Sequence, residues 1–137
     1  MELSLNNIDQ LPSIENLKKN AQSLALLDAI LMPDWEYRYF SFNSKWNVGE
    51  MMSSMRDGSG NEYFILFCPT GAVGKVFYSQ MRIGATVNPV PETFSSFKSE
   101  NAFSLTDATY FFLAKIGRKE VVNPTSKQTF LVKVSKR

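Results

Sequence analysis

The chain has 137 residues, of which 44% are hydrophobic and 13% aromatic, a composition that predicts one folded domain over residues 1–137 and excludes intrinsic disorder. Its 15 Lys and Arg and 13 Asp and Glu give a net charge of +2 without a clustered basic face, so we expect no nucleic-acid partner. No apolar run reaches the length of about 18 residues that suggests a membrane span, and the N-terminus does not resemble a signal peptide, so we expect a cytosolic protein with no membrane partner.

The residue types on which many catalytic and metal sites depend are scarce in this chain. It has no His, which removes Ser-His and Cys-His nucleophile pairs and the usual zinc sites. Its one cysteine, Cys68, can neither fill a zinc shell nor form an internal disulfide. The acidic residues are spread singly rather than in pairs at helical spacing. We therefore expect no enzyme activity, no metal and no cofactor, and keep a carboxylate-based hydrolase as the alternative.

The first predicted element is a helix that begins after Pro12 and ends before Pro33. Ser13 can cap its first turn, and Glu15 suits the positive end of the helix dipole. An apolar stripe recurs at helical spacing and consists of Ile14, Leu17, Ala21, Leu24, Ala25 and Leu31. We expect this stripe to pack the helix on a sheet.

Two strands are predicted next, on either side of a polar loop. Trp35–Phe42 begins with an alternation that places Trp35, Tyr37 and Tyr39 on one face. Glu50–Arg56 is the second strand, with Met51, Ser53 and Met55 on one face and Met52 and Ser54 on the other. Asn43–Gly49 between them has the composition of a loop. Trp46 in this loop is a candidate interface anchor because Trp is enriched at the centres of interfaces; the alternative is that it covers the edge of the core.

The centre of the chain predicts a meander of antiparallel strands. Tyr63–Phe67 is an apolar run too short for a helix, which favours a strand covered on both faces. Asp57–Asn61 before it is a tight turn rich in Gly, and Pro69–Gly71 after it is a second turn. Ala72–Tyr78 then forms the next strand.

Two segments of this meander partly match ligand-binding motifs, and neither match is complete. Gly71–Lys75 resembles the end of a phosphate-binding loop, but Pro69 stands where that loop needs Gly and Val76 where it needs Ser or Thr. Asp57–Asn61 has polar residues at calcium-loop spacing, but Gly residues occupy the positions between them and the twelfth position lacks Glu. A hairpin turn is the better interpretation of Asp57–Asn61.

Beyond Ser79 the chain predicts a short helix and two further strands. The helix begins at Pro91 and places Phe94 and Phe97 on one face, and Phe103 is expected to fill the space beneath it. The remaining segments are a connection (Gln80–Pro91), a buried strand (Ala108–Ile116), a polar turn region (Gly117–Gln128) and a last strand (Thr129–Val134). The predicted fold is α+β: a mostly antiparallel sheet of five or six strands, packed by the N-terminal helix and the short later helix.

Three stretches, which cover more than half of the chain, resemble a family of uncharacterised bacterial proteins. They are Leu24–Phe67, which contains the motifs SFNSKW and SMRDGSG, then Gly71–Phe77, and then Val90–Phe112. In its order of elements this family is similar to the SUKH superfamily, whose bacterial members include immunity proteins that bind and neutralise toxins. Relatives tend to carry polar or acidic residues, often with a histidine, near Tyr78–Gln80, and the C-terminal part of this chain is shortened. The resemblance therefore implies an α+β, SUKH-like fold without a site at those positions.

We expect a small binding protein, namely an immunity-type protein that occludes a bacterial toxin. Trp46 would anchor the interface, surrounded by polar residues from neighbouring strand ends: Asn43, Arg56, Asp57 and Glu62. The alternatives are the carboxylate-based hydrolase and a self-associating structural or regulatory module that pairs through the edge of its last strand. A closed pocket with two buried carboxyl groups of raised pKa would favour the hydrolase, and a shallow surface with exposed aromatic residues the binding protein.

Overall fold

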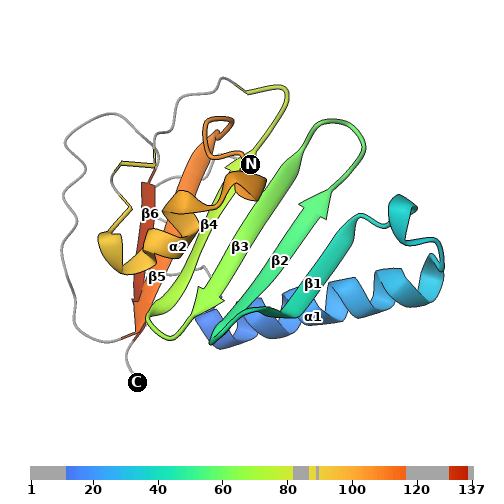
Figure 1. Cartoon of the computed structure of the whole chain (residues 1–137). Coiled ribbons are helices and arrows are strands. Elements are labelled where there is room, and N and C mark those ends of the chain that lie inside the picture. Colours follow the sequence, from blue (N-terminus) through green and yellow to red (C-terminus); the bar gives the residue numbers. More distant parts are fainter. Residues whose placement is uncertain (1–11, 82–86, 89, 117–129, 136–137) are drawn as a thin grey trace.

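The computed structural model shows one sheet with helices on its two faces (Figure 1), and it describes residues 12–81, 87–88, 90–116 and 130–135. Within these residues the strands are β1 (Phe40–Asn47), β2 (Glu50–Arg56), β3 (Glu62–Cys68), β4 (Gly71–Phe77), β5 (Tyr110–Ile116) and β6 (Phe130–Ser135). The α-helices are α1 (Ile14–Leu31) and α2 (Ser95–Ser99), and short 3-10 turns form η2 (Trp35–Tyr37), η3 (Glu92–Phe94) and η4 (Asn101–Phe103).

The strands lie side by side in the order in which the chain makes them, from β1 at one edge to β6. Neighbouring strands from β1 to β5 are antiparallel, and β6 runs parallel to β5. This arrangement confirms the predicted α+β fold with a mostly antiparallel sheet, an N-terminal helix and a short later helix.

The central strands β3 and β4 are buried on both faces. Successive residues of a strand point to opposite sides, so both faces of these strands must be covered. On the first face, α2, η3 and η4 cover the strands, and the rings of Phe64 and Phe97 each lie 5.3 Å from the ring of Phe103, between centroids. On the second face, the start of α1 packs against β3 and its neighbours. Residues 64–67 are therefore all buried, which confirms that the Tyr63–Phe67 run is a strand covered on both sides.

The N-terminal half of α1 packs on the second face of the sheet, whereas its C-terminal half lies beside the start of β1. Ser13 caps the helix as predicted, by accepting a hydrogen bond of 3.2 Å from the backbone N–H three residues later. Ile14 and Leu17 reach the second face of the sheet. Leu24 and Leu31 are instead 41% and 71% exposed, because α1 extends past the outermost strand, β1 (Figure 1). The predicted packing of the apolar stripe is wrong for these two leucines.

The prediction that Trp35–Phe42 is a strand is wrong for residues 35–39 and confirmed for Phe40–Phe42, which belong to β1. Its first residues form the 3-10 turn η2, and pairing with β2 begins at Phe40, opposite Met55. The guanidinium of Arg38 donates hydrogen bonds of 2.7 and 2.8 Å to two carbonyl groups just after α1 and so holds the chain in a bend. The alternation of aromatic and polar residues is a local signal, and this tie to the end of α1 overrides it.

The predicted loop Asn43–Gly49 is largely part of a strand, since β1 continues to Asn47. The register between β1 and β2 shifts between Asn43 and Asn47, an irregularity that we name the β1 bulge. The connection itself is Val48–Gly49, and Gly49 supplies a φ of 71° that residues with a Cβ rarely adopt. An edge strand with one wet side needs few apolar residues, so the polar sequence of β1 resembled a loop.

The later elements agree with the prediction where the structure describes them. The short helix is formed by η3 and α2, and the side chains of Phe94, Phe97 and Phe103 are fully buried around it. The last two predicted strands are present as β5 and β6. The predicted turn region Gly117–Gln128 and part of the predicted connection Gln80–Pro91 lie outside the described residues.

Candidate functional site

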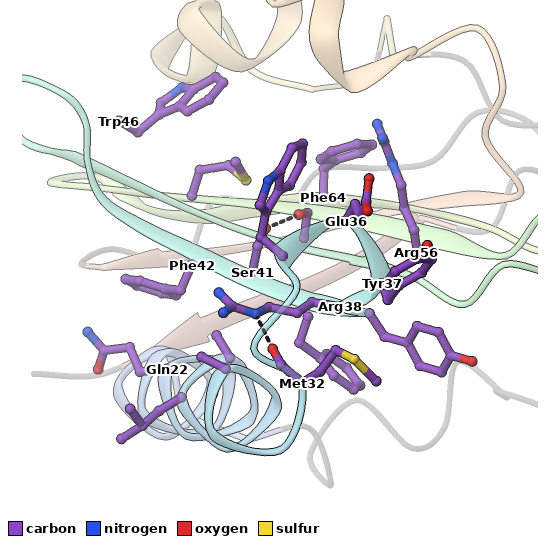
Figure 2. A pocket seen from close by; sticks show the side chains of 18 of the residues that line it. Gln22, Met32, Glu36, Tyr37, Arg38, Ser41, Phe42, Trp46, Arg56 and Phe64 are labelled. Carbon is purple, nitrogen blue, oxygen red and sulfur yellow. Dashed lines mark hydrogen bonds between the residues drawn. The ribbon is translucent and has the colours of Figure 1, made fainter.

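A groove of about 1220 Å³ follows β1 along the edge of the sheet. Figure 2 shows it from close by, with Trp46 and Phe64 on one side of the sheet and Phe42 and Gln22 on the other. It is lined by the C-terminal half of α1, by the segment from η2 into β1, and by the first face of the sheet next to η4. The groove brings exposed aromatic side chains together with polar ones, which makes it the candidate site.

The outer wall of the groove is aromatic and exposed. Trp35, Tyr37 and Tyr39 are 78%, 62% and 54% exposed, although residues of this size usually bury most of their surface. Their backbone is held in place, since the Asp28 carboxylate of α1 accepts hydrogen bonds from the N–H groups of Tyr39 and Phe40 at 2.6 and 2.8 Å. The hydrogen bonds from the Arg38 guanidinium to the two carbonyl groups after α1 hold the other side of the bend. The aromatic residues are therefore presented on a braced segment.

The inner wall is a row of rings on the first face of the sheet. The β1 bulge turns Trp46 to this face, where its half-buried ring stacks on Phe103 with 5.7 Å between centroids and 21° between planes. Phe103 contacts Phe64 in turn. Between the walls, the hydroxyls of Ser41 and Ser54 lie 2.6 Å apart and form a polar pair. Rings beside hydroxyl groups suit a polypeptide segment, which has apolar side chains and a polar backbone.

Three charged side chains meet around Phe64 at one end of this row. Lys75 is fully buried, and its ammonium donates to Oε1 of Glu62 at 3.1 Å and to the carbonyl oxygen of Ser104 at 2.7 Å. Nε of Arg56 lies 3.6 Å from Oε2 of Glu62, and its guanidinium lies over the Phe64 ring at 5.5 Å. Two cations share one carboxylate, so the cluster carries one net positive charge. Arg56, with a side chain 69% exposed, presents that charge to the groove.

Asp57 stabilises the turn between β2 and β3. Its carboxylate accepts hydrogen bonds from the side-chain amide of Asn61 at 2.7 Å, and from the backbone N–H groups of Ser59 and Asn61 at 2.8 and 3.1 Å. The Asn61 amide, followed by the Ser59 N–H, holds the pKa of Asp57 below its ordinary value. A carboxyl group that acts as a general acid needs the opposite shift. The geometry therefore gives Asp57 a structural role in the hairpin.

The five predicted site residues do not form one patch around Trp46. Arg56 and Glu62 face each other across β2 and β3, and Asp57 follows in the adjoining turn. Trp46 and Asn43 lie toward the other end of β1, near the bulge. The Asn43 side chain accepts a hydrogen bond of 2.9 Å from the backbone N–H two residues later, so it shapes the bulge. Trp46 and Arg56 both line the groove and are connected through the row of rings.

Sequence reasoning missed the outer wall. It assigned Trp35, Tyr37 and Tyr39 to one face of a strand. The signal that favours a turn is the pair Pro33–Asp34 directly after the helix, since both residue types are common in turns.

The groove lacks the parts of a paired-carboxylate site. Among the described residues that line it, Glu36 is the single carboxylate. Within the described ranges, no group of three or more Cys, Asp and Glu is placed to hold a metal ion, and no helix there has the length and apolar character that crossing a membrane requires. Comparison with known proteins finds no matching family model, no matching curated protein and no matching solved structure. The groove is therefore interpreted from its own residues.

Proposed function

We propose that the protein is a protein-binding module that receives a segment of a partner protein in the groove along β1. The observation that carries this proposal is the outer wall, in which three large aromatic side chains are exposed on a braced backbone. Such side chains are enriched at the centres of protein interfaces, where they contribute most of the binding energy. The net positive charge of the cluster at Arg56 favours an acidic side chain in the bound segment.

The size and lining of the groove favour a protein over a small substrate. Its volume of about 1220 Å³ exceeds the roughly 300–1,000 Å³ of most small-molecule pockets. It lies open along the edge of the sheet, and its described carboxylate, Glu36, belongs to the η2 turn (Figure 2). A carboxylate-based hydrolase places two such groups about a scissile bond. No described feature of the groove favours that alternative.

The partner that we favour is a bacterial toxin domain, with this protein as its immunity protein. The support is the resemblance of the chain to a family similar in element order to the SUKH superfamily, together with an α+β arrangement that suits it. In this proposal the protein neutralises the toxin by covering part of its surface, with the exposed aromatic residues as anchors and Arg56 orienting the approach. The mechanism involves no covalent step, which agrees with a chain that has no His.

The experiment uses the proteins encoded by the open reading frames beside the gene, since an immunity gene is expected next to its toxin gene. Isothermal titration calorimetry with the whole chain measures binding, and co-expression measures the relief of toxicity. Trp35→Ala is the decisive variant because a side chain that is 78% exposed can be removed without opening the core. We expect its Kd to be at least about 30-fold weaker, which corresponds to the roughly 2 kcal/mol of an interface hot spot.

Met81→Ala is the matched control, because Met81 is 56% exposed and does not line the groove. We expect it to change the Kd by less than about threefold. Trp46→Ala is less informative, since Trp46 also stacks on the buried Phe103 and its removal disturbs the core. Equal binding of the Trp35→Ala variant and the wild type would show that the groove is not the binding site. Failure of every neighbouring gene product to bind would contradict the immunity role.

A further inference from the structure

The side of α1 that faces away from the groove carries an apolar stripe. Leu24, Leu27, Ile30 and Leu31 are 41%, 53%, 67% and 71% exposed, and none of them lines the groove. Their spacing of three and four residues places them together on one side of the helix. These four residues, here named the α1 stripe, lie on the half of the helix that extends past β1 (Figure 1).

We propose that the α1 stripe is a two-fold interface with a second copy of this chain, in which the two α1 helices pack antiparallel. Leucines that recur at three- and four-residue spacing are the pattern that fits between the side chains of a facing helix of the same kind. Leu27 lies in the middle of the stripe and meets its own copy near the two-fold axis. The groove lies on another side of α1, so this interface and the proposed partner site are separate surfaces.

The charge distribution along α1 favours a second copy over a different protein. In a two-fold contact each residue near the axis meets its own copy, so a charge there would repel itself. Between residues 20 and 31 the one charged residue is Asp28. Its carboxylate is turned inward, where it accepts the N–H groups of Tyr39 and Phe40. The outward side of this part of α1 therefore presents no charge to a neighbouring copy.

The exposed area of the stripe sets the strength of the dimer. If a fully exposed aliphatic side chain contributes about 100 Å², the exposed fractions of the four residues leave roughly 230 Å² of apolar surface per copy. A standard interface buries about 800 Å² per partner, and about 57–65% of this is non-polar. The stripe supplies about half of that non-polar area, which places the contact among the small interfaces. The dimer is therefore weak and depends on the protein concentration.

The test is the mass of the full chain in solution, measured by light scattering between about 10 and 500 μM, a range in which a weak dimer associates. We expect the mass to rise from the 15.5 kDa of one chain toward twice that value. Leu27→Glu places two carboxylates at the axis and is expected to remain monomeric throughout, with an unchanged circular dichroism spectrum because Leu27 is half exposed. Gln22→Glu adds the same charge to the groove side of the same helix and is expected to dimerise as the wild type does.

A constant mass of 15.5 kDa for the wild type, or a Leu27→Glu variant that dimerises as well as the wild type, would overturn the proposal. Cysteine cross-linking gives an independent measurement in a Cys68→Ser background. Leu27→Cys is expected to form a disulfide-linked dimer on mild oxidation, and Gln22→Cys is not; the reverse result would place the contact elsewhere. The partner proposal is tested separately, because Leu27→Glu leaves the groove intact and Trp35→Ala leaves the α1 stripe intact.

Discussion

The replacement of Glu62 by Gln tests the buried ion pair beside the groove. The side chain of Lys75 is 0% exposed, and its ammonium has Glu62 at 3.1 Å and the carbonyl oxygen of Ser104 at 2.7 Å as hydrogen-bond partners. Gln keeps an acceptor oxygen but removes the carboxylate charge, so the ammonium is left buried without its counter-ion. Removal of one partner of a buried pair typically destabilises a protein by about 3–5 kcal/mol. Because Glu62 is 21% exposed and Gln can still accept a hydrogen bond, we expect the lower end, about 3 kcal/mol.

Lys75→Met is the variant with which Glu62→Gln is compared, because it removes the buried charge instead of the counter-ion. Met has a side chain of similar length and removes the buried charge itself. It leaves Glu62 partly exposed, with Arg56 still 3.6 Å away. We expect this variant to lose only about 1 kcal/mol of unfolding free energy. Once Lys75 has been replaced, the further change of Glu62 to Gln should alter the stability by less than about 0.5 kcal/mol. The reason is that the cost of Glu62→Gln in the wild type comes from leaving the buried ammonium of Lys75 without its counter-ion.

Urea unfolding at pH 7, followed through the fluorescence of the two tryptophans, gives the free energy of unfolding of each variant. All variants are compared at one protein concentration, so that any self-association affects them alike. Glu62→Gln should be less stable than Lys75→Met by about 2 kcal/mol. Equal stabilities, the reverse order, or a loss below about 1 kcal/mol for Glu62→Gln would refute the reasoning.

Two further predictions concern the backbone and the pH dependence of stability. A Cβ on Gly71, which has a φ of 146°, would lie 1.9 Å from the carbonyl oxygen of Ala114, so Gly71→Ala should lose about 3 kcal/mol or more; Gly58→Ala, with nothing within 4 Å, should lose about 1 kcal/mol through its positive φ alone. Equal urea midpoints for the two variants would contradict this steric argument. Burial raises the pKa of Tyr110 to about 12 from 10.0. The unfolded chain therefore ionises first, and stability that is fully present below pH 10 falls as the pH rises toward 12. Tyr110→Phe should show a smaller loss of its urea midpoint over this range, and an identical loss in both proteins would show that Tyr110 does not cause it.

The central strands could be predicted because turn-forming residues in the sequence mark where each strand begins and ends. Tyr63–Phe67 is apolar on both faces, and Gly and Pro mark the turns on either side of it. The second half of β1 could not be predicted because its strand character comes from pairing with β2, while most residues from Asn43 to Asn47 are polar. The wrong prediction that Leu24 and Leu31 pack on the sheet has a related cause. A helical pattern shows which residues share a side, but it does not show where the sheet beneath that side ends.

The candidate site could be predicted only in part, because most of its contacts depend on how the strands pair and not on the local sequence. The contact between Arg56 and Glu62 follows from a hairpin, since the tight turn between them places the two residues opposite each other. The buried position of Lys75 depends on partners 13 and 29 residues away in the chain. The stacking of Trp46 on Phe103 depends on the β1 bulge, which no local sequence motif predicts. Each of these features is a product of the assembled sheet.

The bracing of β1 has a consequence for the behaviour of the sheet as a whole. The outermost strand of a sheet offers unpaired N–H and C=O groups to any other extended chain. Here the Asp28 carboxylate already occupies the N–H of Phe40, the β1 bulge disturbs the regular backbone, and the exposed Lys45 adds a charge. Another strand cannot add regularly along this edge. Recognition on this side must therefore proceed through side chains, and the concentrated protein is protected here against growth into a continuous sheet.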